Sequence, residues 1–145
     1  MTSKDFILNT FRAKGKADAQ LLQKQAKDLT GTQIIANEGC IPNWEPNKDY
    51  SSWTIGAPVK DEDQVWTLLV PHSASAIQPK DDRENWLLCH TTDVLTAKPW
   101  MAPVGSYGHY MKDEVYVDDN GFIWKCLQDD TILCAADYAD AWAEV

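Results

Sequence analysis

Aromatic side chains are the residues of this 145-residue chain whose type and number could support binding chemistry. The chain holds seven Trp, five Tyr and three Phe. The flat face of an aromatic ring stacks on the apolar C–H face of a sugar, while carboxylates, amides and hydroxyls around it bind the sugar hydroxyls. Candidates for such a platform are Trp53, Trp66, Trp100, Tyr107, Tyr110 and Trp124. This chemistry is binding without catalysis.

Several of these rings have a structural alternative, because tryptophan buries a large area and suits the core of a small domain. Four tryptophans recur at similar places in two parts of the chain: Trp66, Trp86, Trp124 and Trp142. A recurring aromatic residue in a tiny domain is more often part of its core, so we expect Trp86 and Trp142 to be structural. For Trp53 and Trp100 a surface role and a core role are equally open.

Other kinds of site lack a recognisable motif. His72, His90 and His109 do not have the spacing of metal ligands, and the neighbouring Cys89 and His90 would point to opposite sides of a strand. The sequence contains no GxSxG, HExxH, P-loop or GxGxxG motif. Carboxylates are plentiful, but no pair is marked by an apolar pocket sequence as a glycosidase would require. We therefore expect no metal, no cofactor and no enzymatic activity.

The elements that must position these residues begin with a hairpin near the C-terminus. Residues 115–117, VYV, form a β-rich run, and residues 118–121, DDNG, form a turn whose Asn-Gly pair supplies the positive φ angles of tight hairpins. Residues 122–127, FIWKCL, predict the return strand because they include no Gly or Pro. A loop then leads to Trp142.

The same order of elements occurs upstream and indicates an internal repeat. Residues 59–70 contain a strand, an acidic turn and a return strand. Trp66 on that return strand is followed by Trp86 after twenty residues. Trp124 on the later strand is followed by Trp142 after eighteen. Counted from the valine of each first strand to the tryptophan of the second, the spacing is seven and nine residues, so the second turn is expected to be about two residues longer.

This order (tyrosine, Gly/Asp-Val strand, tight turn, strand with an aromatic ring, proline-containing loop, closing tryptophan) resembles the carbohydrate-binding modules of families 5 and 12, which are chitin-binding type 3-like. The match covers roughly residues 44–88 and 107–145. The resemblance implies two tandem sugar-binding units. The modules carry two adjacent tryptophans after the second strand, and this chain has Val70-Pro71-His72 and Gln128-Asp129-Asp130 there instead. His72, Gln128 and Asp129 are therefore candidates for the polar side chains that bind the sugar hydroxyls.

The full-length layout resembles small tail-module proteins of prophages in gut Firmicutes. The resemblance rests on a helical start, the stretch IPNWEPNKDYSSW, the two units and the phrase AKPWMAPVGSYGHYMKDE. It implies a virion tail component whose partners are a polysaccharide or bacterial cell-wall glycan and other tail proteins. The alternative is a structural tail or baseplate adaptor with no glycan ligand, which buries its aromatic units against neighbouring subunits.

The beginning of the chain is expected to be helical. Phe6 and Phe11 share one face of the segment 3–29 at helical spacing, and Gly15 interrupts it. Residues 32–37 predict one further helical turn. Such a segment either covers the open sheets or joins identical helices in a homo-oligomer. A membrane-surface role is disfavoured because Asp residues dilute its positive charge.

The predicted fold is mainly β, with an N-terminal α-helical segment and two small β-hairpin-based units. We expect a helical segment at residues 1–39, a first β unit at 40–90, a connector at 91–106 and a second β unit at 107–145. Trp100 lies in the connector, outside both repeated units. Units of this size are at the edge of independent stability, so they are expected to pack together or oligomerise.

Charge and composition limit the partners. The net charge of −9 is divided unevenly: residues 1–38 carry six basic and four acidic side chains, net +2, and residues 39–145 carry seven and eighteen, net −11. An acidic surface disfavours nucleic acid and also keeps a domain soluble. The sequence shows no signal-peptide core and no bilayer-spanning run. We therefore expect synthesis in the cytoplasm without a cleaved signal, association with a virion tail, and no membrane insertion.

The four cysteines, Cys40, Cys89, Cys126 and Cys134, have no CxxC spacing. In a reducing compartment they are expected to act as small buried hydrophobic residues. A Cys126–Cys134 disulfide is the alternative that the spacing allows.

Overall fold

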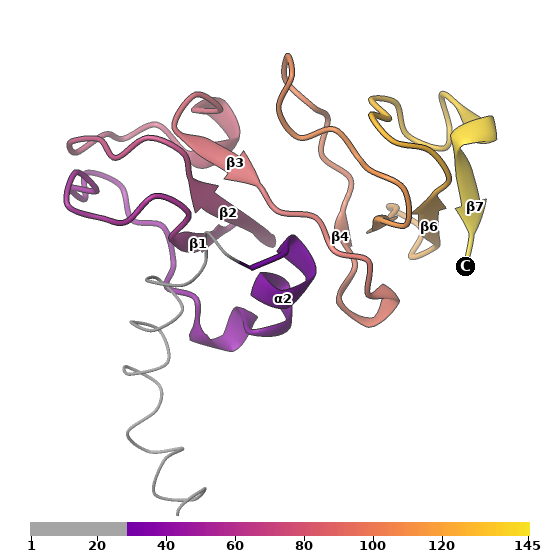
Figure 1. Cartoon of the computed structure of the whole chain (residues 1–145), viewed down its shortest axis with the longest axis horizontal. Coiled ribbons are helices and arrows are strands. Elements are labelled where there is room, and N and C mark those ends of the chain that lie inside the picture. Colours follow the sequence, from indigo (N-terminus) through magenta and orange to yellow (C-terminus); the bar gives the residue numbers. More distant parts are fainter. Residues whose placement is uncertain (1–28) are drawn as a thin grey trace, which may run out of the picture.

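The computed structural model describes residues 29–145, which are mainly β, as the sequence predicted. They form two small sheets, one with the strand order β1-β2-β3 and one with the order β4-β5-β6-β7. Figure 1 shows the two sheets beside each other, joined by the chain that runs from β3 to β4. The helix predicted over residues 3–29, and the oligomer expected to form through it, depend on residues outside this part of the chain.

The elements have the following bounds. The strands are β1 (Pro58–Asp61), β2 (Gln64–Leu68), β3 (Trp86–Leu88), β4 (Lys98–Pro99), β5 (Val115–Val117), β6 (Ile123–Cys126) and β7 (Trp142–Glu144). The described residues also contain the α-helix α2 (Gly31–Ala36) and short 3₁₀ helices at Glu38–Cys40, Pro79–Asp81, Val94–Thr96 and Ala139–Ala141.

Helix α2 confirms the helical turn predicted at residues 32–37. Thr30 is the N-cap of this helix, because its hydroxyl accepts a hydrogen bond from the Gln33 amide while the Gln33 side chain accepts one from the Thr30 amide. This reciprocal pair is a capping box. Ile34 and Ile35 of α2 pack with Val65 of β2 in one hydrophobic cluster. The helix therefore covers one face of the first sheet (Figure 1).

Both predicted hairpins form, with different turns. Glu62 and Asp63 have φ angles of 48° and 63°. Two consecutive positive φ angles between paired strands define a type I′ turn. In the second hairpin Gly121 takes φ 84° within a longer loop. In the register, Val59 faces Trp66 and Tyr116 faces Trp124. The second turn is thus one residue longer than the first, not two, because the residue that corresponds to Val59 is Tyr116 and not the valine before it.

The two hairpins use the same backbone hydrogen bonds at corresponding positions. The Gly56 amide donates to the Leu68 carbonyl at 2.7 Å, and the Asp113 amide donates to the Cys126 carbonyl at 2.8 Å. Gly56 and Asp113 both have positive φ, 91° and 76°. The strand residues that accept these bonds pair with corresponding tryptophans, Trp86 and Trp142.

Trp100 also has a counterpart in the first sheet, although the sequence analysis assigned it to the connector outside both units. Asn43, just before Trp44, forms a parallel bridge with β1. Pro99, just before Trp100, pairs in parallel with β5. Trp100 therefore occupies in the second sheet the place that Trp44 occupies in the first. The predicted connector is partly built into the second sheet as its edge strand β4.

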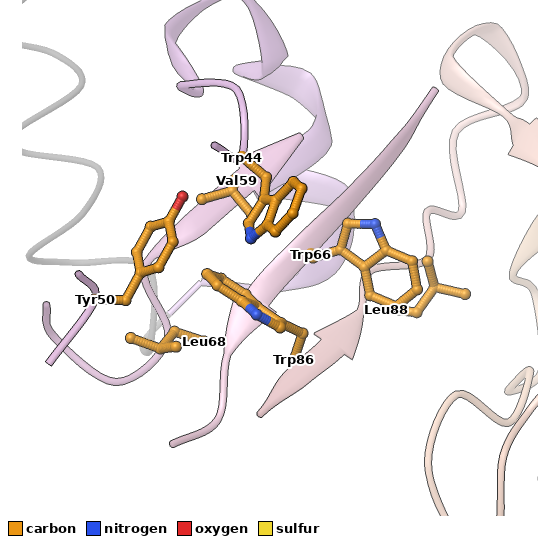
Figure 2. Packing of buried hydrophobic residues seen from close by; sticks show 7 residues of the cluster. All are labelled: Trp44, Tyr50, Val59, Trp66, Leu68, Trp86 and Leu88. Carbon is orange, nitrogen blue, oxygen red and sulfur yellow. The ribbon is translucent and has the colours of Figure 1, made fainter. Parts of the chain in front are cut away.

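An aromatic core fills one face of the first sheet. Its buried members are Trp44, Tyr50, Val59, Trp66, Leu68, Trp86 and Leu88. Figure 2 shows Trp86 at the centre of this cluster, with Tyr50 on one side and Trp66 on the other. The Tyr50 and Trp86 rings meet edge to face, with centroids 5.1 Å apart. Burying one such side chain stabilises a fold by about 1.5–3 kcal/mol. Trp86, and Trp142 in the second sheet, are buried, as expected of structural residues.

The two sheets are joined by direct contacts. The Gln64 side chain donates to the Pro99 carbonyl at 2.7 Å, and the Arg83 guanidinium donates to the Ala102 carbonyl at 3.2 Å. The amide of Val115, at the start of β5, donates to a backbone carbonyl ahead of β4. The sheets therefore pack together in one chain, which is one of the two outcomes that their small size led us to expect.

All four cysteines are free thiols, so the alternative disulfide between Cys126 and Cys134 is not formed. Cys89 and Cys126 are buried. Burial raises the pKa of the Cys89 thiol to about 12, which keeps it protonated and unreactive at neutral pH. Within residues 29–145, none of the helices has the length and apolar character needed to cross a bilayer.

Candidate ligand-binding groove

The structure brings two of the predicted aromatic residues together on one cavity. Trp100 and Trp124, both half-buried, line a cavity of about 590 Å³ on the second sheet. Its lining residues are Pro99, Trp100, Tyr116, Val117, Asp118, Asp119, Asn120, Trp124, Cys134, Ala135 and Ala136. Mostly apolar clefts of this volume with a few polar groups are typical of small-ligand sites. We call this cavity the Trp100–Trp124 groove.

The position of Trp124 is fixed by the loop between β5 and β6. Its indole Nε1 donates to Asp118 Oδ2 at 2.9 Å. Asp118 Oδ1 accepts the amides of Asn120 and Phe122, each also at 2.9 Å. The indole hydrogen bond is the main cause that lowers the pKa of Asp118, and the backbone amides lower it further. The carboxylate is therefore ionised at neutral pH, and it both shapes the turn and orients the ring.

The position of Trp100 is fixed by a stack of three rings. Trp100 stacks on Tyr110, with centroids 4.8 Å apart and planes at 13°. His90 stacks on Tyr110 at 3.7 Å, also at 13°. The two neighbours must lie on opposite faces of the tyrosine, because one face cannot hold both rings. Trp100 also meets Tyr116 at 5.1 Å, in an edge contact. One face of Trp100 is thus covered by protein, and the remaining surface of the ring lines the groove.

The far end of this stack is polar and buried. His90 Nδ1 lies 3.2 Å from Glu114 Oε1, and the His90 side chain is only 7% exposed. Its Nε2 has no hydrogen-bond partner among the described residues. His90 and Glu114 belong to the lining of another cavity, of about 430 Å³, which is formed by residues of α2, β2 and β3 and by the segment just before β5. Among residues 29–145, no group of three His, Cys, Asp or Glu side chains is placed to hold a metal ion.

The other predicted site residues lie elsewhere. Trp66 and Tyr110 are 1% and 2% exposed, so neither ring offers a free face. Trp53 packs edge to face on Tyr50 beside the core of the first sheet. Tyr107 is exposed but does not belong to the groove lining. His72 meets the Trp86 ring edge to face.

The two polar candidates of the second sheet also lie away from the groove. Gln128 lines a separate cavity of about 190 Å³, and its carbonyl accepts the Thr131 hydroxyl. The Asp129 carboxylate accepts the Lys112 amide at 2.9 Å. These two candidates therefore do not contribute to the lining of the Trp100–Trp124 groove.

The corresponding rings of the first sheet are covered. Trp44 and Trp66, which correspond to Trp100 and Trp124, are both buried. The guanidinium carbon of Arg83 lies 4.8 Å from the centroid of the Trp66 ring. Met101 packs against the same cluster. The first sheet therefore leaves little accessible surface on this pair of rings, which are 9% and 1% exposed.

Sequence reasoning missed Tyr116, Asp118 and Asn120 as groove residues. Residues 118–121 were interpreted only as a turn, and Tyr116 only as part of a strand. A signal was present, because an aspartate at the start of an Asn-Gly turn is well placed to bond a tryptophan at the beginning of the return strand.

No protein-family model matches this chain, and no curated protein matches it in sequence. The fold and the groove define a general class: a small, mainly β protein with one aromatic and acidic groove.

Proposed function

We propose that this protein binds a glycan without transforming it, and that the Trp100–Trp124 groove is the binding site. The observation that carries the proposal is the presence of two half-buried indoles and a polar loop on one open cavity. An indole can stack on the apolar face of a sugar, while the side chains of Asp119 and Asn120, both exposed, can bind its hydroxyls.

The setting we propose is attachment of a phage tail, or a tail-like particle, to a polysaccharide or cell-wall glycan of the host. Two resemblances support it: that of the hairpin units to carbohydrate-binding modules, and that of the chain layout to prophage tail-module proteins. A single shallow groove gives weak binding, and display of many copies raises the overall affinity through effective concentration.

The chemistry of Asp118 supports a binding role for the groove and not a catalytic role for this carboxylate. Glycoside hydrolysis needs one carboxylic acid that stays protonated near neutral pH, which requires a raised pKa. The pKa of Asp118 is lowered instead, above all by the hydrogen bond from Trp124. Both carboxylate oxygens are already used to hold the loop and the ring. Asp118 is therefore suited to a structural and electrostatic role.

A structural adaptor is the second candidate function, and one observation favours it. Four large apolar side chains in the segment between β6 and β7 are exposed: Leu127, Ile132, Leu133 and Tyr138. Ile132, Leu133 and Tyr138 share the lining of the cavity of about 190 Å³. An exposed apolar patch of this kind is typical of surfaces that pack against another protein.

A binding assay on insoluble chitin, cellulose and Firmicutes cell walls tests the proposed function. The wild-type protein should be retained on at least one matrix, and Trp124→Ala should lose retention while circular dichroism shows it folded. Trp53→Ala is the control, because it removes a half-buried tryptophan outside the groove. Failure of the wild type to bind any matrix would refute glycan binding and favour the adaptor.

A further inference from the structure

We infer that the ligand of the Trp100–Trp124 groove carries a positive charge, as a primary or quaternary ammonium group on a glycan. The inference rests on the proposed function and specifies its ligand class. It is carried by the chemistry of the groove lining and by a cation that the chain itself places on the corresponding ring of the first sheet.

Among residues 29–145, the side chains that line the groove include acidic ones and no basic ones. Asp118 and Asp119 are present, and the remaining lining residues are aromatic, small, apolar or neutral polar. Neither aspartate belongs to an ion pair formed within the described part of the chain. No Lys, Arg or His among residues 29–145 therefore neutralises the negative charge beside the two indoles through an ion pair.

The rings themselves favour a cation. The face of an indole carries negative electrostatic potential, and tryptophan is the best of the aromatic side chains for holding an ammonium or guanidinium group. Trp124 donates its N–H to the Asp118 carboxylate. A hydrogen bond to an anion shifts electron density into the ring, so this contact strengthens the attraction of the Trp124 face for a cation.

In the first sheet, the ring that corresponds to Trp124 has a cationic side chain as its partner. Trp66 and Trp124 occupy the same register, opposite Val59 and Tyr116. The Arg83 guanidinium lies over the Trp66 ring, 4.8 Å from its centroid. The groove on the second sheet has no such side chain in its lining. A cationic ligand group would give Trp124 the kind of partner that Trp66 has within the chain.

The two aspartates have different parts in this arrangement. The oxygens of Asp118 already accept bonds from Asn120, Phe122 and Trp124, so it acts on the ligand through its charge. Asp119 is exposed at the groove, where its carboxylate can pair with the ammonium directly. The electrostatic field around the groove also favours a cationic ligand, because residues 39–145 carry a net charge of −11. Such a field attracts cations and repels purely anionic glycans.

The experiment compares soluble probes by titration calorimetry with the full-length protein at mildly acidic pH and low salt. The probes are glucosamine oligosaccharide, N-acetylglucosamine oligosaccharide of the same length, and choline. We expect the glucosamine oligosaccharide or choline to bind roughly tenfold more tightly than the N-acetylated sugar, with affinity falling as salt is added. The two cationic probes distinguish an amino sugar from a quaternary ammonium group.

Asp119→Asn should reduce the preference for the cationic probe severalfold and leave binding of the N-acetylated sugar unchanged. Asp63→Asn is the matched control, because it removes the same charge from the turn of the other hairpin, where asparagine tolerates the positive φ of 63°. Equal or tighter binding of the N-acetylated sugar would overturn the charge inference and leave glycan binding intact. An unchanged preference in Asp119→Asn would also overturn it. Absence of binding by both cationic probes, in a protein that is retained on one of the insoluble matrices, would overturn the charge inference alone. Absence of binding by every probe and on every matrix would overturn the proposed function as well.

Discussion

The indole nitrogen of Trp124 donates a 2.9 Å hydrogen bond to the carboxylate of Asp118, six residues earlier in the chain. This bond connects the most local feature of the second hairpin, its turn, to the ring that borders the groove. The shape of the turn and the accessibility of the ring therefore depend on the same side chain.

Replacement of Asp118 should affect the stability of the fold and the orientation of the Trp124 ring together. Asp118→Ala removes the acceptors of the Asn120 and Phe122 amides and of the Trp124 indole, so the melting temperature should fall and Trp124 should lose its fixed orientation. Asp118→Asn keeps an acceptor oxygen and should be milder. Thermal melts followed by tryptophan fluorescence would measure both effects. If the Asp118→Ala protein were as stable as the wild type, the hydrogen bonds that Asp118 accepts would not stabilise the fold as described.

The pH dependence of stability gives a second prediction. The pKa of Asp118 is lowered from its ordinary value of 3.8, mainly by the Trp124 hydrogen bond. A lowered folded-state pKa contributes stability that is fully present above pH 3.8 and is lost as the pH falls through the folded-state pKa. The stability difference between wild type and Asp118→Asn should therefore shrink on acidification below that pH. A difference that stays constant through this range would show that the ionised carboxylate does not stabilise the fold.

The aromatic core of the first sheet predicts a large effect at Trp86. Trp86→Ala leaves a cavity at the centre of the cluster in Figure 2 and should cost about 3–5 kcal/mol of unfolding free energy. Trp53→Ala should cost clearly less, since Trp53 is only partly buried beside this core. Urea denaturation of the two variants measures the difference. Equal losses would show that Trp86 does not have the central position described.

Calorimetry with a glycan retained in the binding assay should give one site per chain. Only the second sheet presents the tryptophan pair on an open cavity, because Trp44 and Trp66 are buried in the first. A fitted stoichiometry near one, abolished by Trp124→Ala, agrees with this arrangement. A stoichiometry of two would require a second surface that the buried pair cannot provide.

Thiol reactivity offers a test that needs no ligand. Cys89 and Cys126 are buried, whereas Cys40 and Cys134 are partly accessible. Two thiols should react with an aromatic disulfide reagent in the native protein and four in denaturant. Burial raises the pKa of the Cys89 thiol to about 12, so Cys89 should stay unreactive even in mildly alkaline buffer. Rapid reaction of all four native thiols would contradict the described packing.

Local turn chemistry allowed much of this fold to be predicted from the sequence. The Asn-Gly pair marked the second hairpin, and Gly121 takes the positive φ that such a turn requires. The recurring Trp86 and Trp142 were correctly assigned to the core. The register of the second hairpin was misjudged, because counting from valine to tryptophan does not reveal that Tyr116 is the residue opposite Trp124.

The groove was harder to predict because accessibility depends on distant residues. Trp66 and Trp124 occupy corresponding positions, yet Arg83 lies over Trp66 while Trp124 borders an open cavity. Trp100 is positioned by the parallel pairing of β4 with β5, and no local sequence pattern predicts that pairing. Sequence reasoning therefore identified the aromatic side chains that could bind a ligand but could not separate the accessible rings from the covered ones.

The stack of His90, Tyr110 and Trp100 joins residues that follow the first sheet to residues built into the second. Unfolding either sheet would expose at least one ring of this stack and part the His90–Glu114 contact. The energetic consequence is coupling: neither sheet can melt while the other keeps all its native contacts. This small protein should accordingly fold as one cooperative unit, with its groove intact only when both sheets are in place.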